Sequence, residues 1–143
     1  MREIPSLTIF AKKDLNDDMK VLRVYYAHAI CLYGTEREKK EMMLIRERFK
    51  DAEMINPANY PDHSMDFYIR LVDKCHIVVF SCLLGKVTSG VGKEVNYALN
   101  KGKDVYMLNE VNLFPMKSPV KYTSRQCTVE LYQEWLKQQE LKL

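Results

Sequence analysis

The sequence predicts an α/β fold: a single domain with an open parallel sheet and helices on both faces. Short apolar segments of strand length alternate with longer segments whose apolar residues recur at helical spacing. This alternation is typical of parallel strands joined by right-handed crossovers. A length of 143 residues fits one domain. We therefore expect one domain over 1–143, with its core at about 21–108 and a C-terminal helix at about 128–142.

Four segments carry clear strand signals. The segment 76–81 is dominated by a continuous apolar run, which is typical of a strand buried on both faces of a parallel sheet. The segment 21–27 is rich in β-branched and aromatic residues, and 52–56 and 104–108 are shorter candidates. A weaker segment, 6–11, would be an added edge strand or an arm. We expect the strands at 21–27, 76–81 and 104–108 to be central or adjacent.

Helical periodicity fills the intervals between these strands, at 35–51, 64–74, 92–103 and 129–142. The first of these helices opens with Thr35 followed by Glu38, which is a capping-box pattern. Ser64 is a candidate cap for the second, and Gly102 ends the third. Each helix has an apolar stripe with which it can cover the sheet.

Composition excludes several classes of function. The chain is 47% hydrophobic and 29% charged, as expected of a folded globular protein. Its net charge of +3 is spread over interleaved acids and bases, so binding to a nucleic-acid polymer is not indicated. No apolar run approaches the ~20 residues of a membrane span, and no secretory signal is visible. We expect a cytoplasmic protein without membrane contact.

The cysteines and histidines do not form a recognisable metal-binding pattern. The four cysteines stand far apart without a CxxC pair, which favours free thiols in a reducing compartment. His28 and His63 both lack a ligand partner at helical spacing. We therefore expect no metal ion, and no cofactor.

Ligands of open α/β sheets bind beyond the carboxyl ends of the strands, where the strand order reverses. The rule selects the loops 27–35, 57–64 and 82–92. The last contains the glycine turn "TSGVG", and Glu94 follows it at the start of a helix. Backbone N–H groups at such a turn favour an anionic or hydroxyl-rich group. Glu94 is either an ordinary acid at a helix start or the working group of a ligand site.

Other polar side chains are expected at the same edge. Tyr25 and Tyr26 are adjacent in a strand, so they point to opposite faces of the sheet. His28, just after the strand, is either a structural histidine or a ligand-binding one. The second loop offers Asn59 and Asp66, and its prolines either shape a pocket or simply stiffen a crossing of the sheet edge.

The stretch "SGVGKEVNYALNKGKDVYML" resembles the signature of the nucleoside 2-deoxyribosyltransferase family, which includes the 2′-deoxynucleoside 5′-monophosphate N-glycosidases. The similarity extends over about 21–108 and is concentrated near Glu94. Asn96 stands where the family usually has glycine. The matching residues are Gly90, Gly92, Glu94, Val95, Ala98, Lys101 and Lys103.

The resemblance implies a flavodoxin-like or Rossmann-like fold and an enzyme that cleaves or transfers at the N-glycosidic bond of a nucleoside or nucleotide. Glu94 would be the nucleophile, with Tyr25 positioning it or the sugar. A carboxylate suits this chemistry because it can trap or stabilise the oxocarbenium-like sugar. At a helix start we expect its pKa to stay low. The expected substrate-binding residues are His28, Tyr26, Ser89, Gly90, Gly92 and Asn59.

The chain also departs from the family pattern. Tyr68 stands where the family has the aspartate that assists departure of the base, so Asp66 becomes the displaced candidate, and Asp73 suits a helix end. The serine and arginine found in monophosphate-specific members after the first strand are replaced by "HAIC". Ser89 and the glycine turn would remain for a phosphate, with His28 or Tyr33 as substitutes.

Three functions stay open. The first is an N-glycosidase or a deoxyribosyltransferase, since the sequence does not separate hydrolysis from transfer. The second is an NAD-consuming enzyme of the TIR-like type, and the third is a non-catalytic nucleotide-binding module. The family also implies a homodimer or higher homo-oligomer whose neighbour closes the pocket; alternatively, Leu131, Trp135 and Leu136 cover the sheet of their own chain.

Overall fold

A five-stranded sheet with the order β2-β1-β3-β4-β5 forms the centre of the molecule. The computed structural model describes residues 21–142. Strands β1 to β4 are parallel, and β5 runs antiparallel to β4. The prediction of an open α/β sheet is confirmed, with parallel pairing over β1 to β4 and an antiparallel β5 that was not expected, and β1, β3 and β4 are neighbours as predicted. The strands are β1 (Arg23–Ala27), β2 (Glu53–Ile55), β3 (Ile77–Ser81), β4 (Asp104–Asn109) and β5 (Asn112–Met116).

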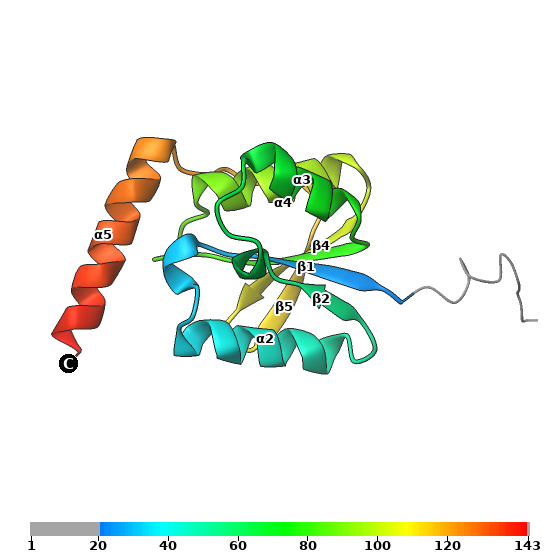
Figure 1. Cartoon of the computed structure of the whole chain (residues 1–143), viewed down its shortest axis with the longest axis horizontal. Coiled ribbons are helices and arrows are strands. Elements are labelled where there is room, and N and C mark those ends of the chain that lie inside the picture. Colours follow the sequence, from blue (N-terminus) through cyan, green and yellow to red (C-terminus); the bar gives the residue numbers. More distant parts are fainter. Residues whose placement is uncertain (1–20, 143) are drawn as a thin grey trace, which may run out of the picture.

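Helices cover both faces of the sheet (Figure 1). Helix α2 lies on one face, α3 and α4 lie on the other, and α5 stands at the end of the molecule where β1 leads into its following loop. Two short 3-10 helices interrupt the loops after β1 and β2. The helical elements are η1 (Ile30–Leu32), α2 (Glu36–Arg48), η2 (Pro57–Asn59), α3 (Met65–Asp73), α4 (Ser89–Asn100) and α5 (Arg125–Leu141).

Alternation along the central strands divides the core into two layers. Tyr25 packs in the cluster beneath α3 and α4, together with Val78 and Val95. Tyr26 packs in the cluster beneath α2, together with Ile45. Adjacent residues therefore serve opposite faces, as the strand geometry requires.

Three helix starts use the side chains that local sequence favours. Thr35 accepts a hydrogen bond from the backbone N–H of Glu38, Ser64 accepts one from Phe67, and Ser124 caps α5. Helix α4 differs, because it begins at Ser89 and its N-cap residue makes no side-chain capping bond. The expected start at 92 was wrong, so both glycines lie in the first turn of the helix.

The strand β5 was not predicted. Its sequence contains Pro115, and it is joined to β4 by a tight turn in which Glu110 has a φ of 57°. A proline is tolerated here because β5 is an edge strand with β4 as its partner. The weak candidate strand at 6–11 lies outside the described residues.

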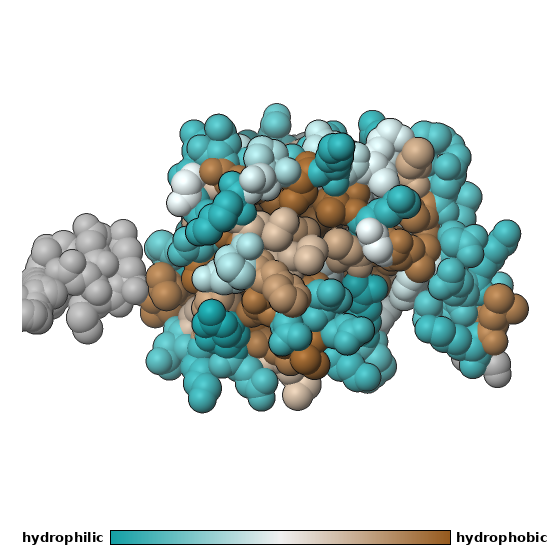
Figure 2. All heavy atoms as spheres, turned by 180° about the vertical axis from the view of Figure 1, so that it is seen from behind, coloured by the Kyte–Doolittle hydropathy of each residue, from teal (hydrophilic) through white to brown (hydrophobic). Residues whose placement is uncertain are grey.

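The side of the molecule seen in Figure 2 carries an apolar band across its middle, with polar side chains above and below. Large apolar side chains exposed around α2 and the β4–β5 turn include Met43, Val111 and Phe114. Over residues 21–142, every helix is too short or too polar to cross a bilayer.

Candidate functional site

The strand order reverses between β1 and β3, because the chain proceeds from β1 to β2 on one side and from β3 to β4 on the other. Ligands of this fold class bind at such a point, beyond the carboxyl ends of the strands. The loops that meet there are 28–35 and 82–88. An apolar contact joins both loops to α5, and its residues are Ala29, Cys31, Leu32, Leu83, Leu84, Leu131, Tyr132 and Trp135.

Tyr25 and Glu94 form a buried pair below this point. The Tyr25 hydroxyl donates to Glu94 Oε2 at 2.5 Å, across the gap between β1 and α4. Tyr25 is fully buried, and Glu94 is 6% exposed. Among the described residues, no protein donor contacts the other carboxylate oxygen of Glu94. One oxygen is therefore held by Tyr25, and the other has no protein donor within 21–142.

Burial raises the pKa of Glu94 to about 7, and the hydrogen bond from Tyr25 opposes this rise. The expectation of a low pKa was wrong. Glu94 is the sixth residue of α4, beyond the first turn in which the helix dipole acts most strongly. No ion pair involves Glu94 within 21–142, so the hydrogen bond from Tyr25 alone offsets its desolvation among the described residues. This also excludes the reading of Glu94 as an ordinary first-turn charge.

Two further tyrosines lie near Glu94. Burial, followed by the charge of Glu94, raises the pKa of the half-buried Tyr33. Burial is also the main cause that raises the pKa of Tyr132 on α5, with a smaller contribution from Glu94. Tyr132 was missed by sequence reasoning because its place depends on how α5 folds back. Glu94 therefore has one phenol in direct contact, Tyr25, and two more within electrostatic reach, Tyr33 and Tyr132.

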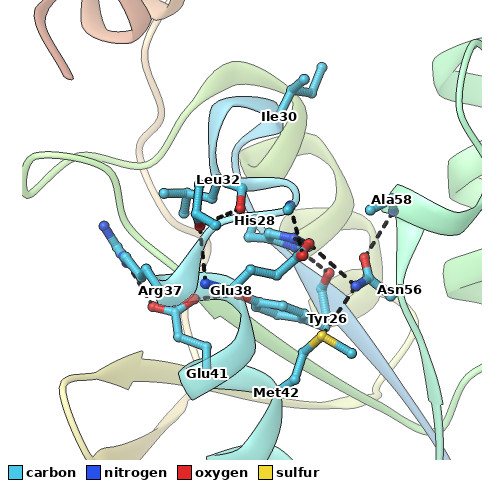
Figure 3. Close-up of polar contacts among 12 residues, drawn as sticks. Tyr26, His28, Ile30, Leu32, Arg37, Glu38, Glu41, Met42, Asn56 and Ala58 are labelled. Atoms are coloured by element: carbon cyan, nitrogen blue, oxygen red, sulfur yellow. Dashed lines mark hydrogen bonds and ion pairs between the residues drawn. The ribbon is translucent and has the colours of Figure 1, made fainter. Parts of the chain in front are cut away.

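His28 and Tyr26 belong to a separate network on the α2 face (Figure 3). The Tyr26 hydroxyl donates to Glu41 Oε1 at 2.5 Å. The Nε2 atom of His28 lies 2.8 Å from Glu38 Oε2, and its Nδ1 atom lies 3.0 Å from the carbonyl oxygen of Tyr26. Its ring stacks on Tyr26 with centroids 3.7 Å apart.

This network holds the loop after β1. A carbonyl oxygen only accepts, so Nδ1 of His28 carries a proton. Burial lowers the pKa of His28, and its hydrogen bonds with Glu38 and the Tyr26 carbonyl oppose this change. Burial acts to raise the pKa of Glu38, but hydrogen bonds from His28, Gly34 and Asn56 outweigh it and lower that pKa. All polar atoms of His28 thus have protein partners, and its geometry fits a structural role instead of contact with a ligand.

The outer candidates occupy different places. Asp66 is the second residue of α3 and is exposed, and Asn59 is exposed at the end of η2. The start of α3 lies beside α4. A methyl group added to Gly90 on α4 would lie only 3.3 Å from the Cε atom of Met65 on α3. Tyr68 donates to the Tyr60 carbonyl at 2.6 Å, so its hydroxyl fixes the loop after β2.

Ser89 contacts the first turn of α5, and Gly92 and Asn96 contact the segment that leads into this helix. The backbone N–H of Ser89 donates to Thr128 Oγ1 at 3.0 Å. A methyl group on Gly92 would lie 2.3 Å from the Tyr122 ring, so only glycine permits this contact. The Asn96 side chain exchanges two hydrogen bonds with the Val120 backbone, at 2.8 and 3.0 Å.

A groove of about 570 Å³ lies elsewhere, between α2 and the β4–β5 turn, and contains none of the residues around Glu94. Its lining residues are Leu44, Glu47, Arg48, Lys50, Val111, Asn112 and Leu113.

Within the described part of the chain, no group of three or more histidine, cysteine, aspartate or glutamate side chains comes close enough together to hold a metal ion. Comparisons of the chain with protein-family models, with curated proteins and with solved structures gave no match.

Proposed function

We propose that the protein cleaves or transfers at the N-glycosidic bond of a nucleoside or nucleotide, with Glu94 as the nucleophile. The observation that carries this proposal is the buried Tyr25–Glu94 pair at the reversal of strand order. Its bond of 2.5 Å fixes one carboxylate oxygen and leaves the other free of protein donors among the described residues. The resemblance around Glu94 points to the same chemistry.

In the proposed reaction, the free oxygen of Glu94 attacks the anomeric carbon of the sugar as the bond to the base breaks. The electron pair of that bond passes to the base nitrogen, which takes a proton from water or from Asp66. Water or a second base then attacks the same carbon and releases Glu94. In the hydrolytic case, the attacking water gives a proton to solvent.

The pair suits this reaction because the nucleophile must be ionised when the substrate binds. The Tyr25 hydroxyl stabilises the carboxylate, while burial keeps it reactive by withholding water. Tyr33 and Tyr132 supply hydroxyl groups and ring edges near the sugar. No cofactor is required.

The test is release of free base from purified protein. Deoxynucleosides, ribonucleosides, their 5′-monophosphates and NAD are incubated separately and followed by chromatography. Release from a nucleoside or nucleotide supports the proposal, and a new nucleoside formed on addition of a second base identifies transfer. Release from NAD alone would favour the TIR-like alternative. No release from any substrate would leave a binding module and overturn the proposal.

We also propose that the protein works as a cytoplasmic homo-oligomer, at least a dimer. Leu131 and Trp135 contact their own chain, whereas Leu136 of the same helix is 52% exposed. An exposed apolar residue on a helix beside the candidate site is available to a second copy. Light scattering at micromolar concentration tests this, and the mass of a monomer would contradict it.

A further inference from the structure

The pair of side chains that carries the proposed reaction is closed off from solvent in this structure. Tyr25 is fully buried, and Glu94 is only 6% exposed. A carboxylate that attacks a sugar must touch it, so a molecule of that size reaches Glu94 only after a neighbouring element has moved. The element that covers the pair must therefore be able to leave it.

Tyr132 of α5 lies at the point where ligands of this fold class bind. Its hydroxyl accepts from the backbone N–H of Ile30, on the loop after β1, at 3.4 Å. Thr88, on the loop after β3, is a second hydrogen-bonding neighbour of the same hydroxyl, and Glu94 lies within electrostatic reach of it. One phenol thus spans the two loops at the reversal of strand order, near the buried carboxylate.

Helix α5 is held over this point by one apolar stripe. Leu131, Tyr132 and Trp135 pack on the apolar residues of the two loops. Beyond this stripe, Leu136 is 52% exposed and Leu141 is 86% exposed. Figure 1 shows α5 at the end of the molecule, outside the layers of helices that cover the sheet. A helix attached in this way can detach without opening the sheet or its core.

Two contacts mark the place about which α5 can turn. The Thr123 N–H donates to the Val87 carbonyl at 2.9 Å, which holds the segment 120–123 against the loop after β3. At the first turn of α5, Thr128 Oγ1 accepts from the Ser89 N–H at 3.0 Å. Because both contacts precede the apolar stripe, the helix stays attached at its start while the part that carries the stripe moves.

We propose that α5 is a lid over the substrate site: it closes the site by placing Tyr132 between the two loops, and it opens to admit the substrate to Glu94. This inference rests on the proposed function. On opening, Tyr132 moves from between the loops to the rim of the site. The closed form competes with substrate binding, because only the open fraction of the molecules binds substrate. A change that weakens the contact of α5 therefore raises the open fraction and the apparent affinity.

Leu131→Ala tests the lid, because it shortens a side chain of the apolar stripe and leaves Tyr132 and Glu94 in place. The variant should raise kcat/KM for a cleaved nucleoside by roughly fivefold or more, through a lower KM at a similar kcat. Leu136→Ala is the matched control on the same helix, and should leave both constants unchanged because Leu136 is exposed. A kcat/KM that is unchanged or lower in Leu131→Ala would overturn the lid and leave the proposed function standing.

Chemical labelling of Glu94 provides a readout that does not depend on catalysis. A water-soluble carbodiimide couples glycinamide to carboxyl groups that solvent reaches, and mass spectrometry of peptides locates the label. Glu94 should be labelled slowly in the wild type and in Leu136→Ala, and about fivefold faster or more in Leu131→Ala. Glu41, which is buried on the other face of the sheet, should be labelled at one slow rate in all three proteins.

The two readouts separate the failure of the lid from the failure of the proposed function. If no nucleoside or nucleotide is cleaved, the proposed function fails, and the labelling alone decides whether α5 closes the site. Equal labelling of Glu94 in Leu131→Ala and the wild type would overturn the lid, as would an equal increase at Glu94 and Glu41. If Leu131→Ala does not fold, Tyr132→Phe, which removes the hydroxyl that joins the two loops, replaces it in the labelling.

Discussion

Two adjacent tyrosines make the same bond to two glutamates on opposite faces of the sheet, with different surroundings. Tyr25 donates to Glu94 and Tyr26 to Glu41, both at 2.5 Å. Glu41 also pairs with the Arg37 Nε at 2.9 Å, and Arg37 contacts the Cys82 carbonyl as well. Within the described part of the chain, no positively charged side chain pairs with Glu94.

The difference separates a structural pair from a candidate reactive one. The charge of Glu41 is balanced by a neighbour, and its network ties α2 to the loop after β3. The charge of Glu94 is unbalanced, and burial raises its pKa to about 7. Such uncompensated groups are typical of functional sites, where stability is exchanged for reactivity.

The largest expected effect is on the rate of base release. Glu94→Gln should lower kcat by about 10³-fold or more, because the proposed nucleophile is lost while the shape is kept. Glu41→Gln is the matched control, and should retain kcat within about tenfold in the folded protein. Steady-state kinetics measure both. Near-wild-type turnover by Glu94→Gln would remove the functional distinction between the two pairs.

The next effect concerns the acid that would protonate the departing base in the proposed reaction. Asp66→Asn should lower kcat by about 10²-fold if Asp66 protonates the departing base. Asp73→Asn is the control, because Asp73 lies at the other end of α3 and accepts from the Tyr97 hydroxyl at 2.8 Å. An unchanged rate in Asp66→Asn would assign protonation of the base to water.

Stability should change in opposite directions at the two pairs. The folded-state pKa of Glu94 lies above its ordinary value near 4.5, so the folded protein binds more protons and loses stability as pH rises from about 4.5 to 7. Glu94→Gln removes this loss and should raise the free energy of unfolding at pH 8 by about 3 kcal/mol. Glu41→Gln should lower it, because Arg37 loses its partner.

Urea unfolding at pH 8 and pH 4.5 measures these changes. At pH 4.5 the gain from Glu94→Gln should largely disappear, because Glu94 of the wild type is then protonated in the folded state. A gain that is equal at both pH values would show that ionisation of Glu94 is not its source.

The smallest effect is a displaced pH profile. If Glu94 is the nucleophile, the rate should rise with pH through its pKa, about 7 in the free protein, because the proposed reactive form is the carboxylate. Tyr25→Phe removes the hydrogen bond that lowers this pKa, so the midpoint of kcat/KM should move upward by about one unit. Tyr26→Phe, on the other face, should leave the midpoint unchanged, and a shared displacement would contradict the separation of the two pairs.

Local patterns predicted much of the fold. The apolar run at 76–81 marked β3, and strand alternation placed Tyr25 and Tyr26 on opposite faces. Thr35 and Ser64 marked two helix starts, because capping depends on neighbouring residues. The start of α4 was misplaced, since its cap comes from Thr128, far away in the sequence.

The electrostatics of the site depend on tertiary structure. Nothing in the residues around Glu94 reveals that it is buried, so its raised pKa required the packed fold. The role of Asn96 was equally hidden, because its partner Val120 lies in a segment without periodicity. The strand β5 was missed because Pro115 weakens a strand pattern.

Pro115 has a consequence for how the sheet ends. An edge strand offers unpaired backbone groups on which another chain can add a strand. Proline has no amide hydrogen, so β5 cannot donate to an incoming strand at this position, opposite Tyr106 in the register. Because a hydrogen-bond donor is missing at Pro115, another strand pairs less readily with the exposed side of β5, and edge-to-edge aggregation is disfavoured.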